Sequence, residues 1–167
     1  MKVLVLVKEV PDTYGDRVLD LETGLADRAA SDRVLDEIGE RAVEAAIVVK
    51  ESNDDVEVVV MSMGPESVGA SIRKALAMGA DRAVHVQDPA LAGADLTATS
   101  EVLAAAIRAE GFDLVVAGNV STDGGGGAIP AMLAERLGVV ALTSLNSLEL
   151  VDGVVRGGRM TDGGTQR

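Results

Sequence analysis

A glycine-rich stretch in the second half of the chain carries the residue types best suited to binding a phosphate group. It reads Gly118-Asn119-Val120-Ser121-Thr122-Asp123-Gly124-Gly125-Gly126-Gly127-Ala128-Ile129-Pro130 and stands between an aliphatic run and a helix-forming segment. Consecutive glycines let backbone N–H groups approach an anion, and a helix amino terminus adds about half a positive charge. The hydroxyl groups of Ser121 and Thr122 can also donate. The alternative is a flexible turn that only joins a strand to a helix.

The stretch matches neither of two common phosphate-binding motifs. No lysine follows the glycines, as a Walker A motif requires, and GxGxxG spacing after the first strand is absent. A second candidate site is the polar segment from Lys8 to Tyr14, which follows the first aliphatic run. Met63 after the second run could touch a base, although methionine often only fills a core. The single histidine, His85, has no nearby ligand partner in the sequence and is interpreted as structural.

Composition removes several classes of function. The chain has 167 residues, no cysteine and one histidine, which excludes thiol catalysis, iron–sulfur clusters and cysteine zinc sites. Its net charge of −12, from 15 basic and 27 acidic residues, argues against binding nucleic acid. Only Tyr14 and Phe112 are aromatic, so base stacking is not expected. No nucleophile has a base beside it. The residues therefore predict a phosphate- or adenylate-binding domain without hydrolytic machinery.

Aliphatic runs and amphipathic stretches alternate along the chain. The runs at 2–8, 56–63, 83–86, 113–117 and 139–142 predict strands. The stretches at 35–49, 67–78, 94–109 and 128–137 predict helices, with Asp32 as the N-cap of the first. This order favours an α/β fold, a Rossmann-like three-layer α/β/α arrangement with a mostly parallel five-stranded sheet. Ligands then bind beyond the carboxyl ends of the strands, at the loops after residues 8, 63 and 118.

The pattern changes after residue 144. Residues 145–160 predict a β-hairpin with Asp152-Gly153 at its turn. We therefore expect a domain over 1–144 and, over 145–167, a hairpin and truncated extension of that domain. The first apolar run, Val3 to Val7, is too short for a signal segment, and no later run reaches the roughly 18–20 residues that span a bilayer. The expectation is a soluble cytoplasmic protein without membrane insertion.

Four segments together resemble the β subunit of electron transfer flavoprotein. They are Val3 to Thr13, Asp36 to Ala46, Ile72 to Arg82 and Gly118 to Pro130, in the order that the family has them. Family members extend beyond residue 167, so the resemblance implies either a fragment or a reduced domain. The same Rossmann-like fold is implied.

The resemblance implies an electron carrier rather than an enzyme. Such a β subunit forms a heterodimer with an α subunit that holds most of the FAD. The pair takes electrons from acyl-CoA-type dehydrogenases, as in fatty acid oxidation, and passes them toward a quinone-linked acceptor. The β subunit holds AMP in a structural role, or a second FAD in electron-bifurcating members. Two alternatives are a stand-alone nucleotide sensor similar to the universal stress proteins and an ATP-cleaving enzyme. The missing lysine and metal ligands disfavour the latter.

Carried over by position, the resemblance implies a set of nucleotide contacts and a flavin-facing loop around Asp12 and Thr13. The four glycines from Gly124 offer only backbone, where the family carries polar side chains. Phosphate contacts would therefore come from N–H groups and from the hydroxyls of Ser121 and Thr122, and AMP is favoured over FAD. The implied nucleotide contacts are Leu6, Asp36, Glu37, Ile38, Gly39, Met63, Gly118, Asn119, Val120, Ser121, Thr122, Asp123, Gly124, Gly125, Gly126, Gly127, Ala128 and Ile129.

Overall fold

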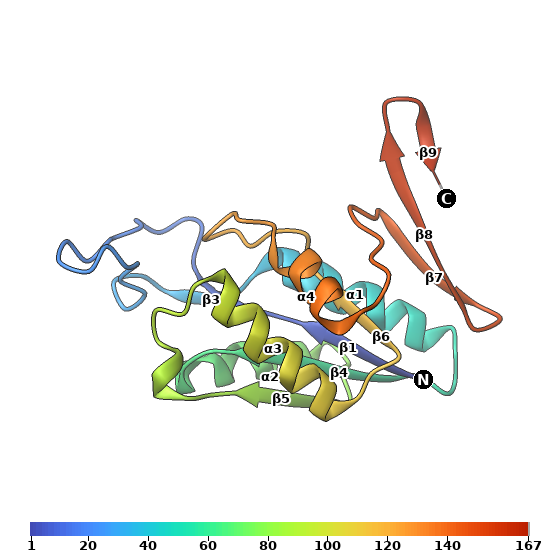
Figure 1. Cartoon of the computed structure of the whole chain (residues 1–167), viewed down its shortest axis with the longest axis horizontal. Helices are drawn as coiled ribbons and strands as arrows, with labels where there is room; N and C mark the ends of the chain where they lie inside the picture. The colour runs from blue at the N-terminus through green and yellow to red at the C-terminus, as the bar shows by residue number, and fades with distance from the viewer. Residues whose placement is uncertain (167) are drawn as a thin grey trace.

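A parallel sheet of four strands lies at the centre of the computed structural model, which describes residues 1–166 (Figure 1). Its strands are β1 (Lys2–Leu6), β4 (Glu57–Met63), β5 (Arg82–Val86) and β6 (Leu114–Ala117), in the order β5-β4-β1-β6. The chain moves outward from β1 to β4 and β5 on one side, then crosses to β6 on the other. The order of strands therefore reverses beside β1, where open α/β sheets bind their ligands.

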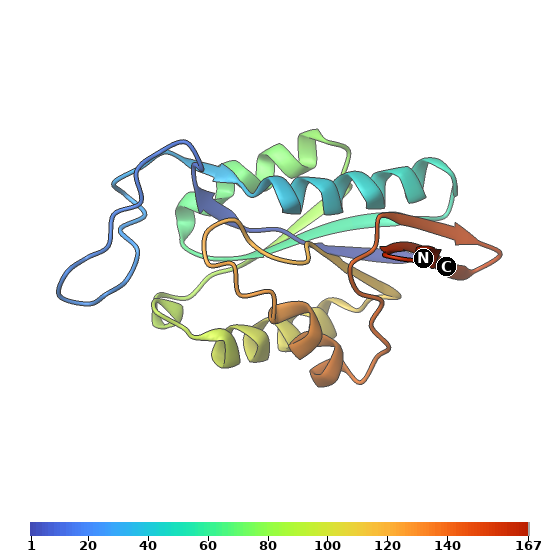
Figure 2. The same ribbon diagram turned by 90° about the horizontal axis from the view of Figure 1, so that it is seen from above.

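Helices cover both faces of this sheet (Figure 2). One face carries α1 (Glu37–Glu51) and α2 (Gly69–Ala77), and the other carries α3 (Leu96–Glu110) and α4 (Ile129–Leu137). Two 3₁₀ helices, η1 (Glu66–Val68) and η2 (Pro89–Leu91), precede α2 and α3. The three-layer α/β/α prediction is confirmed.

Alternation along the strands produces two apolar clusters, one for each face. In β1, the side chains of Val3 and Val5 join the cluster that contains α1, whereas Leu4 joins the cluster that contains α3. In β4, Val60 and Met61 divide in the same way. Successive side chains of a strand point to opposite faces, so a strand buried on both faces reads as one continuous aliphatic run.

The predicted fifth strand at 139–142 is wrong. These residues form no strand, and they follow α4 after Gly138, which has the left-handed conformation that ends a helix. Val140 is 89% exposed and Leu142 is 56% exposed. A parallel strand needs a layer of side chains on each face. Nothing among residues 1–166 covers this segment in that way, so its aliphatic composition does not produce a strand.

A small antiparallel ribbon precedes α1 and was not predicted. It pairs β2 (Glu9–Pro11) with β3 (Arg33–Leu35), and residues 12–32 form a long loop that projects from the body of the molecule (Figure 1). Because β3 occupies residues 33–35, α1 begins later than predicted. Its N-cap is Asp36, not Asp32.

The predicted hairpin is confirmed, and a third strand extends it. β7 (Ser147–Val151), β8 (Val154–Thr161) and β9 (Gly164–Gln166) form an antiparallel sheet beside the main body. Asp152 and Gly153 both have positive φ angles, 53° and 74°, as a two-residue type I′ turn requires. Leu148 and Leu150 pack against the cluster under α1. The predicted extension runs to residue 167, which lies outside the described residues.

No helix in residues 1–166 is both long enough and apolar enough to cross a membrane.

Candidate functional site

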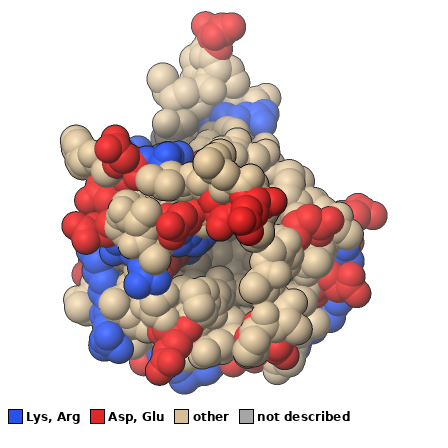
Figure 3. Space-filling model, turned by 90° about the vertical axis from the view of Figure 1, so that its left-hand side faces the viewer, with Lys and Arg blue, Asp and Glu red and all other residues tan. Residues whose placement is uncertain are grey.

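The carboxyl ends of three strands meet at one edge of the sheet. Leu6 at the end of β1 lies opposite Met61 of β4 and Ala117 of β6. Viewed from the side where these strands end, the molecular surface is hollowed near its centre, with acidic and basic side chains around the rim (Figure 3). The glycine-rich stretch from Gly118 to Ala128 leaves the sheet here and leads into α4, as predicted.

Asp36 ties the start of α1 to the glycine-rich stretch. Its side chain is buried, and its carboxylate accepts the N–H of Ile38 at 3.1 Å through Oδ1 and the N–H of Thr122 at 3.0 Å through Oδ2. The N–H of Asp36 donates to the carbonyl of Lys8 at 2.9 Å. One carboxylate therefore caps a helix and fixes one peptide of the stretch.

Gly118 lies close against the first turn of α1. A Cβ atom at this position would lie 2.8 Å from Cγ2 of Ile38 and 3.3 Å from its carbonyl oxygen. Gly39 is buried beside Val7, with 3.8 Å between an added Cβ and the Val7 Cα. Glycine at 118 therefore lets the chain leave β6 next to α1.

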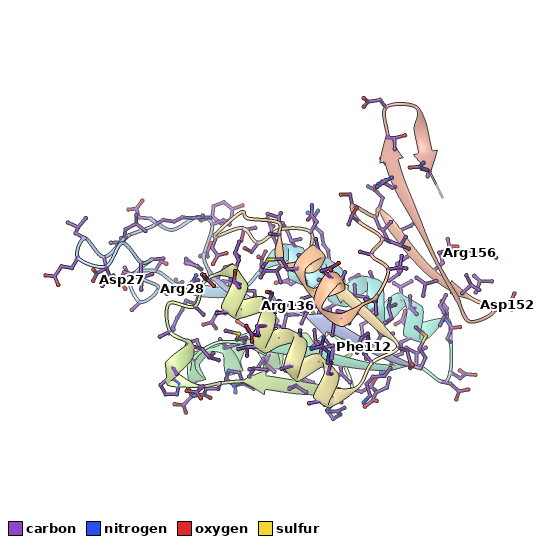
Figure 4. The ribbon with its side chains drawn as sticks, in the orientation of Figure 1. Asp27, Arg28, Phe112, Arg136, Asp152 and Arg156 are labelled. Carbon is purple, nitrogen blue, oxygen red and sulfur yellow. The ribbon has the colours of Figure 1, made fainter. Side chains whose placement is uncertain are left out.

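Asp123 is the centre of a group of charged side chains. Its carboxylate accepts from Lys8 Nζ at 2.7 Å, from Arg28 Nη2 at 2.9 Å and from the N–H of Gly124 at 2.6 Å. Burial opposes ionisation of this carboxyl group, but the hydrogen bonds from Lys8, Ser121, Arg28 and Gly124 outweigh it. The pKa of Asp123 is therefore held well below its usual range. Figure 4 labels Arg28 and its neighbour Asp27 on the projecting loop.

The side chain of Arg17, also on the projecting loop, contacts the backbone of the glycine-rich stretch. Its Nη2 donates to the carbonyl of Thr122 at 2.7 Å, and its Nη1 donates to the carbonyl of Asp123 at 3.1 Å. Sequence reasoning missed Arg17 and Arg28. They lie in a polar loop roughly a hundred residues before their partners, and no local motif marks them.

Several hydrogen-bond donors in this region have no partner among residues 1–166. The Thr122 hydroxyl oxygen is buried and unpaired, and so is that of Ser62 near the end of β4. The backbone N–H groups of Asp123, Gly126 and Gly127 make no hydrogen bond within the described residues. The unpaired hydroxyls of Ser62 and Thr122 are buried and therefore costly, and an acceptor placed beside either one would remove that cost, whereas Gly126 and Gly127 are exposed and their N–H groups are open to solvent or to a ligand. The donor set fits a phosphate group.

Two cavities lie around the stretch. The first, of about 170 Å³, is lined by Thr13, Glu37, Lys74 and Thr122 together with apolar residues of the β2–β3 ribbon. The second, of about 200 Å³, lies under the projecting loop. Its lining includes Lys8, Pro11, Arg17, Val18, Leu19, Ala26, Asp27, Arg28, Ser31, Asp123 and Gly124.

Apart from Asp36, Ile38, Gly39 and Gly118, described above, the predicted site residues divide into four groups. Glu37 and Thr122 line the first cavity, and Asp123 and Gly124 line the second. Leu6, Met63 and Ile129 pack instead against the apolar cluster beneath α3 and α4. Of the remaining stretch, Val120, Ser121 and Ala128 are half-buried, whereas Asn119, Gly125, Gly126 and Gly127 are exposed.

The two residues predicted to face a flavin lie at the end of the β2–β3 ribbon. Asp12 is half-buried, with its N–H bonded to the carbonyl of Asp32 at 2.8 Å and its carboxylate accepting the N–H of Tyr14 at 2.9 Å. Thr13 is exposed and lines the first cavity. His85 bonds the carbonyl of Gly64 at 2.9 Å, which agrees with a structural role. Among residues 1–166, no cluster of three or more acidic or histidine side chains is placed to hold a metal ion.

Comparison with known proteins gives a consistent result. The family model of the electron transfer flavoprotein domain matches residues 23–167. Electron transfer flavoprotein subunit beta of Mycobacterium tuberculosis is 48% identical over 167 residues, which cover 97% of this chain and 63% of the relative. The caffeyl-CoA reductase-Etf complex subunit CarD of Acetobacterium woodii is 39% identical over 153 residues, which cover 91% of this chain and 58% of the relative.

The chain thus spans about 63% of the length of the mycobacterial relative. The family model nevertheless covers β4, β5 and β6 of the parallel sheet and the glycine-rich stretch, and the comparisons confirm the resemblance seen in the sequence. The chain belongs to the electron transfer flavoprotein domain family and is similar to the beta subunits of that family.

Proposed function

We propose that this chain is the nucleotide-holding part of an electron transfer flavoprotein β subunit. It binds AMP in a structural role and pairs with an α subunit that holds FAD. In that complex, electrons pass from acyl-CoA-type dehydrogenases through the flavin to a quinone-linked acceptor. The chain acts as a carrier subunit rather than as an enzyme.

The observation that carries the nucleotide part of this proposal is the set of unpaired donors on the glycine-rich stretch. The buried hydroxyl of Thr122 and the N–H groups of Asp123, Gly126 and Gly127 lack acceptors within residues 1–166. A phosphate group carries several acceptor oxygens and suits backbone donors next to a helix amino terminus. This supports the glycine-rich stretch as the phosphate-binding loop.

The neighbouring charges favour an anion at this loop despite the acidic chain. Lys8 and Arg28 neutralise the carboxylate of Asp123, which would otherwise repel a phosphate. Asp36 is engaged by two N–H groups and holds Thr122 in place.

The flavin side of the proposal rests on the β2–β3 ribbon. Thr13 is exposed and shares the first cavity with Thr122, so the predicted flavin-facing loop lies next to the proposed phosphate loop. When bound in the α subunit, FAD supplies the electron-carrying chemistry. The residues of this chain present a surface to it and hold the adjacent nucleotide.

A second FAD in place of AMP is the alternative, as the bifurcating members imply. One observation favours it: the second cavity adjoins Gly124 and is lined by Lys8, Arg17 and Arg28. The cavity is also lined by Asp27 and by Asp123, with which Lys8 and Arg28 pair, so its three basic side chains exceed its two acidic ones by one charge, which suits the second phosphate of a dinucleotide. The number of flavins bound in a complex decides between the two nucleotides.

Co-expression with a tagged electron transfer flavoprotein α subunit tests the pairing. We expect this chain to be retained by the tag in equal amount, with a flavin absorbance spectrum and one FAD per pair. Two FAD per pair would favour the alternative. The same α subunit expressed without this chain is the control. An α subunit that purifies without this chain would contradict the proposed pairing.

A further inference from the structure

Arg17 makes an unusual contact for a side chain in an exposed loop. Its guanidinium donates to two successive carbonyl oxygens, those of Thr122 and Asp123, at 2.7 and 3.1 Å. The side chain thereby joins the loop of residues 12–32 to the glycine-rich stretch. No other arginine in residues 1–166 donates to two consecutive backbone carbonyls of another segment.

The contact determines which way the neighbouring N–H groups point. A trans peptide is planar, so its C=O and the N–H of the next residue point in opposite directions. With the carbonyl of Thr122 directed at Arg17, the N–H of Asp123 points away from it. The carbonyl of Asp123 is directed the same way, so the N–H of Gly124 also points away from Arg17. That N–H donates to the side-chain carboxylate of Asp123 at 2.6 Å.

The two peptide units that flank the Cα atom of Thr122 are thus both held. Asp36 Oδ2 accepts its N–H at 3.0 Å, and Arg17 donates to its carbonyl. The next N–H along the chain, that of Asp123, is left without an intramolecular partner among residues 1–166, beside the buried hydroxyl of Thr122. The two contacts together leave these donors free for an acceptor from outside the chain.

We propose that Arg17 is a positioning residue: without touching the nucleotide, it orients the peptides of Thr122 and Asp123 so that the glycine-rich stretch can bind phosphate. This inference rests on the proposed function. It makes the loop of residues 12–32 part of the nucleotide site. Because coupling is reciprocal, nucleotide binding in turn holds that loop against the body.

Lysine and glutamine in place of Arg17 separate geometry from charge. Arg17→Lys keeps the positive charge, but its single ammonium group lacks the planar fork that reaches two carbonyls at once. Arg17→Gln removes the charge as well. Arg41→Lys and Arg41→Gln are the matched controls, because Arg41 is exposed on α1 and has no ion pair within residues 1–166.

AMP affinity of each purified variant, freed of bound nucleotide, is measured by calorimetric titration. We expect Arg17→Lys and Arg17→Gln to bind AMP about tenfold more weakly, as loss of charge-assisted hydrogen bonds predicts. Arg41→Lys and Arg41→Gln stay within about twofold of the unmodified chain. The loss at Arg17 persists at high salt, whereas a purely long-range charge effect would be screened.

Amide hydrogen exchange supplies a readout that does not depend on AMP. The N–H of Gly125, bonded to the carbonyl of Ser121 at 3.0 Å, should exchange about tenfold faster in both Arg17 variants. An unmodified chain that binds neither AMP nor FAD would refute the proposed function. Faster exchange of Gly125 in the Arg17 variants would still show that Arg17 holds the glycine-rich stretch in place. If Arg17→Lys matches the unmodified chain in exchange and in any AMP binding, the inference is wrong.

Discussion

Single side chains at the carboxyl edge of the sheet each serve two purposes. Asp36 caps α1 and also holds the Thr122 peptide, so removal of its carboxylate affects both a helix and the proposed phosphate loop. Gly118 is required by packing rather than by backbone conformation, since it faces Ile38 at close range. Each residue has a control elsewhere in the chain. Asp95 caps a helix without contacting the glycine-rich stretch, and Gly126 is a glycine of that stretch without a close neighbour.

Asp36→Ala should lower both stability and AMP retention. Loss of an N-cap costs about 1 kcal/mol, and the lost bond to Thr122 adds roughly the same. Asp95→Ala is the control, because Asp95 caps α3 through the N–H of Ala98 at 2.8 Å and does not contact the glycine-rich stretch. Urea unfolding and nucleotide analysis measure the two effects. Equal loss of AMP in both variants would show that Asp36 acts only as a cap.

Gly118→Ala should destabilise the chain by about 1–3 kcal/mol, because its methyl group would overlap Ile38. In an Ile38→Ala background the same change should cost clearly less, since the overlapping Cγ2 is gone. Gly126→Ala is the control: an added Cβ there would meet only Leu96 Cδ1, at 3.8 Å. Urea unfolding of the double-mutant cycle measures the coupling. Additive effects would mean that Ile38 is not the obstacle.

Among the elements, the alternation of strands and helices could be predicted because it depends on side-chain periodicity. The turn at Asp152-Gly153 was also predictable, since only a few residue pairs favour two positive φ angles. The ribbon of β2 and β3 was not, because three-residue strands have no measurable period. The error at 139–142 shows the converse: aliphatic residues form a strand only where other elements cover them.

The candidate site shows the same limit. The glycine-rich stretch was predicted from its composition and from its place after a buried strand. Arg17 and Arg28 were not, because their contacts depend on how a long loop folds back over the sheet edge. The division of the predicted residues between two cavities and an apolar cluster likewise depends on packing.

The opposite edge of the sheet has its own charged cluster, which joins β1, β5 and α3. Glu110, the last residue of α3, pairs with Arg82 and with Lys2, and its side chain is only 16% exposed. The hydrogen bond from Arg82, with that from Lys2, lowers the pKa of Glu110 from 4.5 to about 2. The ionised group therefore stabilises the fold above pH 4.5, and this contribution is lost as the pH falls toward 2.

Glu110→Gln should lower the free energy of unfolding at pH 7 by about 1 kcal/mol and have little effect near pH 2. The acid-induced loss of stability between pH 4.5 and 2 should accordingly become shallower. Glu51→Gln is the control, because Glu51 ends α1 in the same way but has no ion pair within residues 1–166. Thermal unfolding across this pH range measures the difference. A parallel acid profile in the two variants would rule out the assigned pKa.

On the scale of the whole molecule, the antiparallel sheet of β7, β8 and β9 is packed onto the main body. Leu148 and Leu150 reach the same apolar cluster that holds Val5 and Val43. We therefore predict that residues 1–144 and 145–167 unfold together in a single calorimetric transition. Leu148→Ala and Leu150→Ala should lower its midpoint without splitting it. Two separate transitions would show that the C-terminal sheet is an independent unit.

The proposed function requires a nucleotide at the carboxyl edge of the sheet. The most direct measurement is to denature the purified chain, separate the released small molecule, and identify it by absorbance and mass. We expect AMP, about one per chain, that survives dialysis and is depleted in Asp36→Ala but not in Asp95→Ala. A chain that releases no adenine nucleotide and takes up neither AMP nor FAD would contradict it, as would one that carries only ATP that exchanges freely with solution.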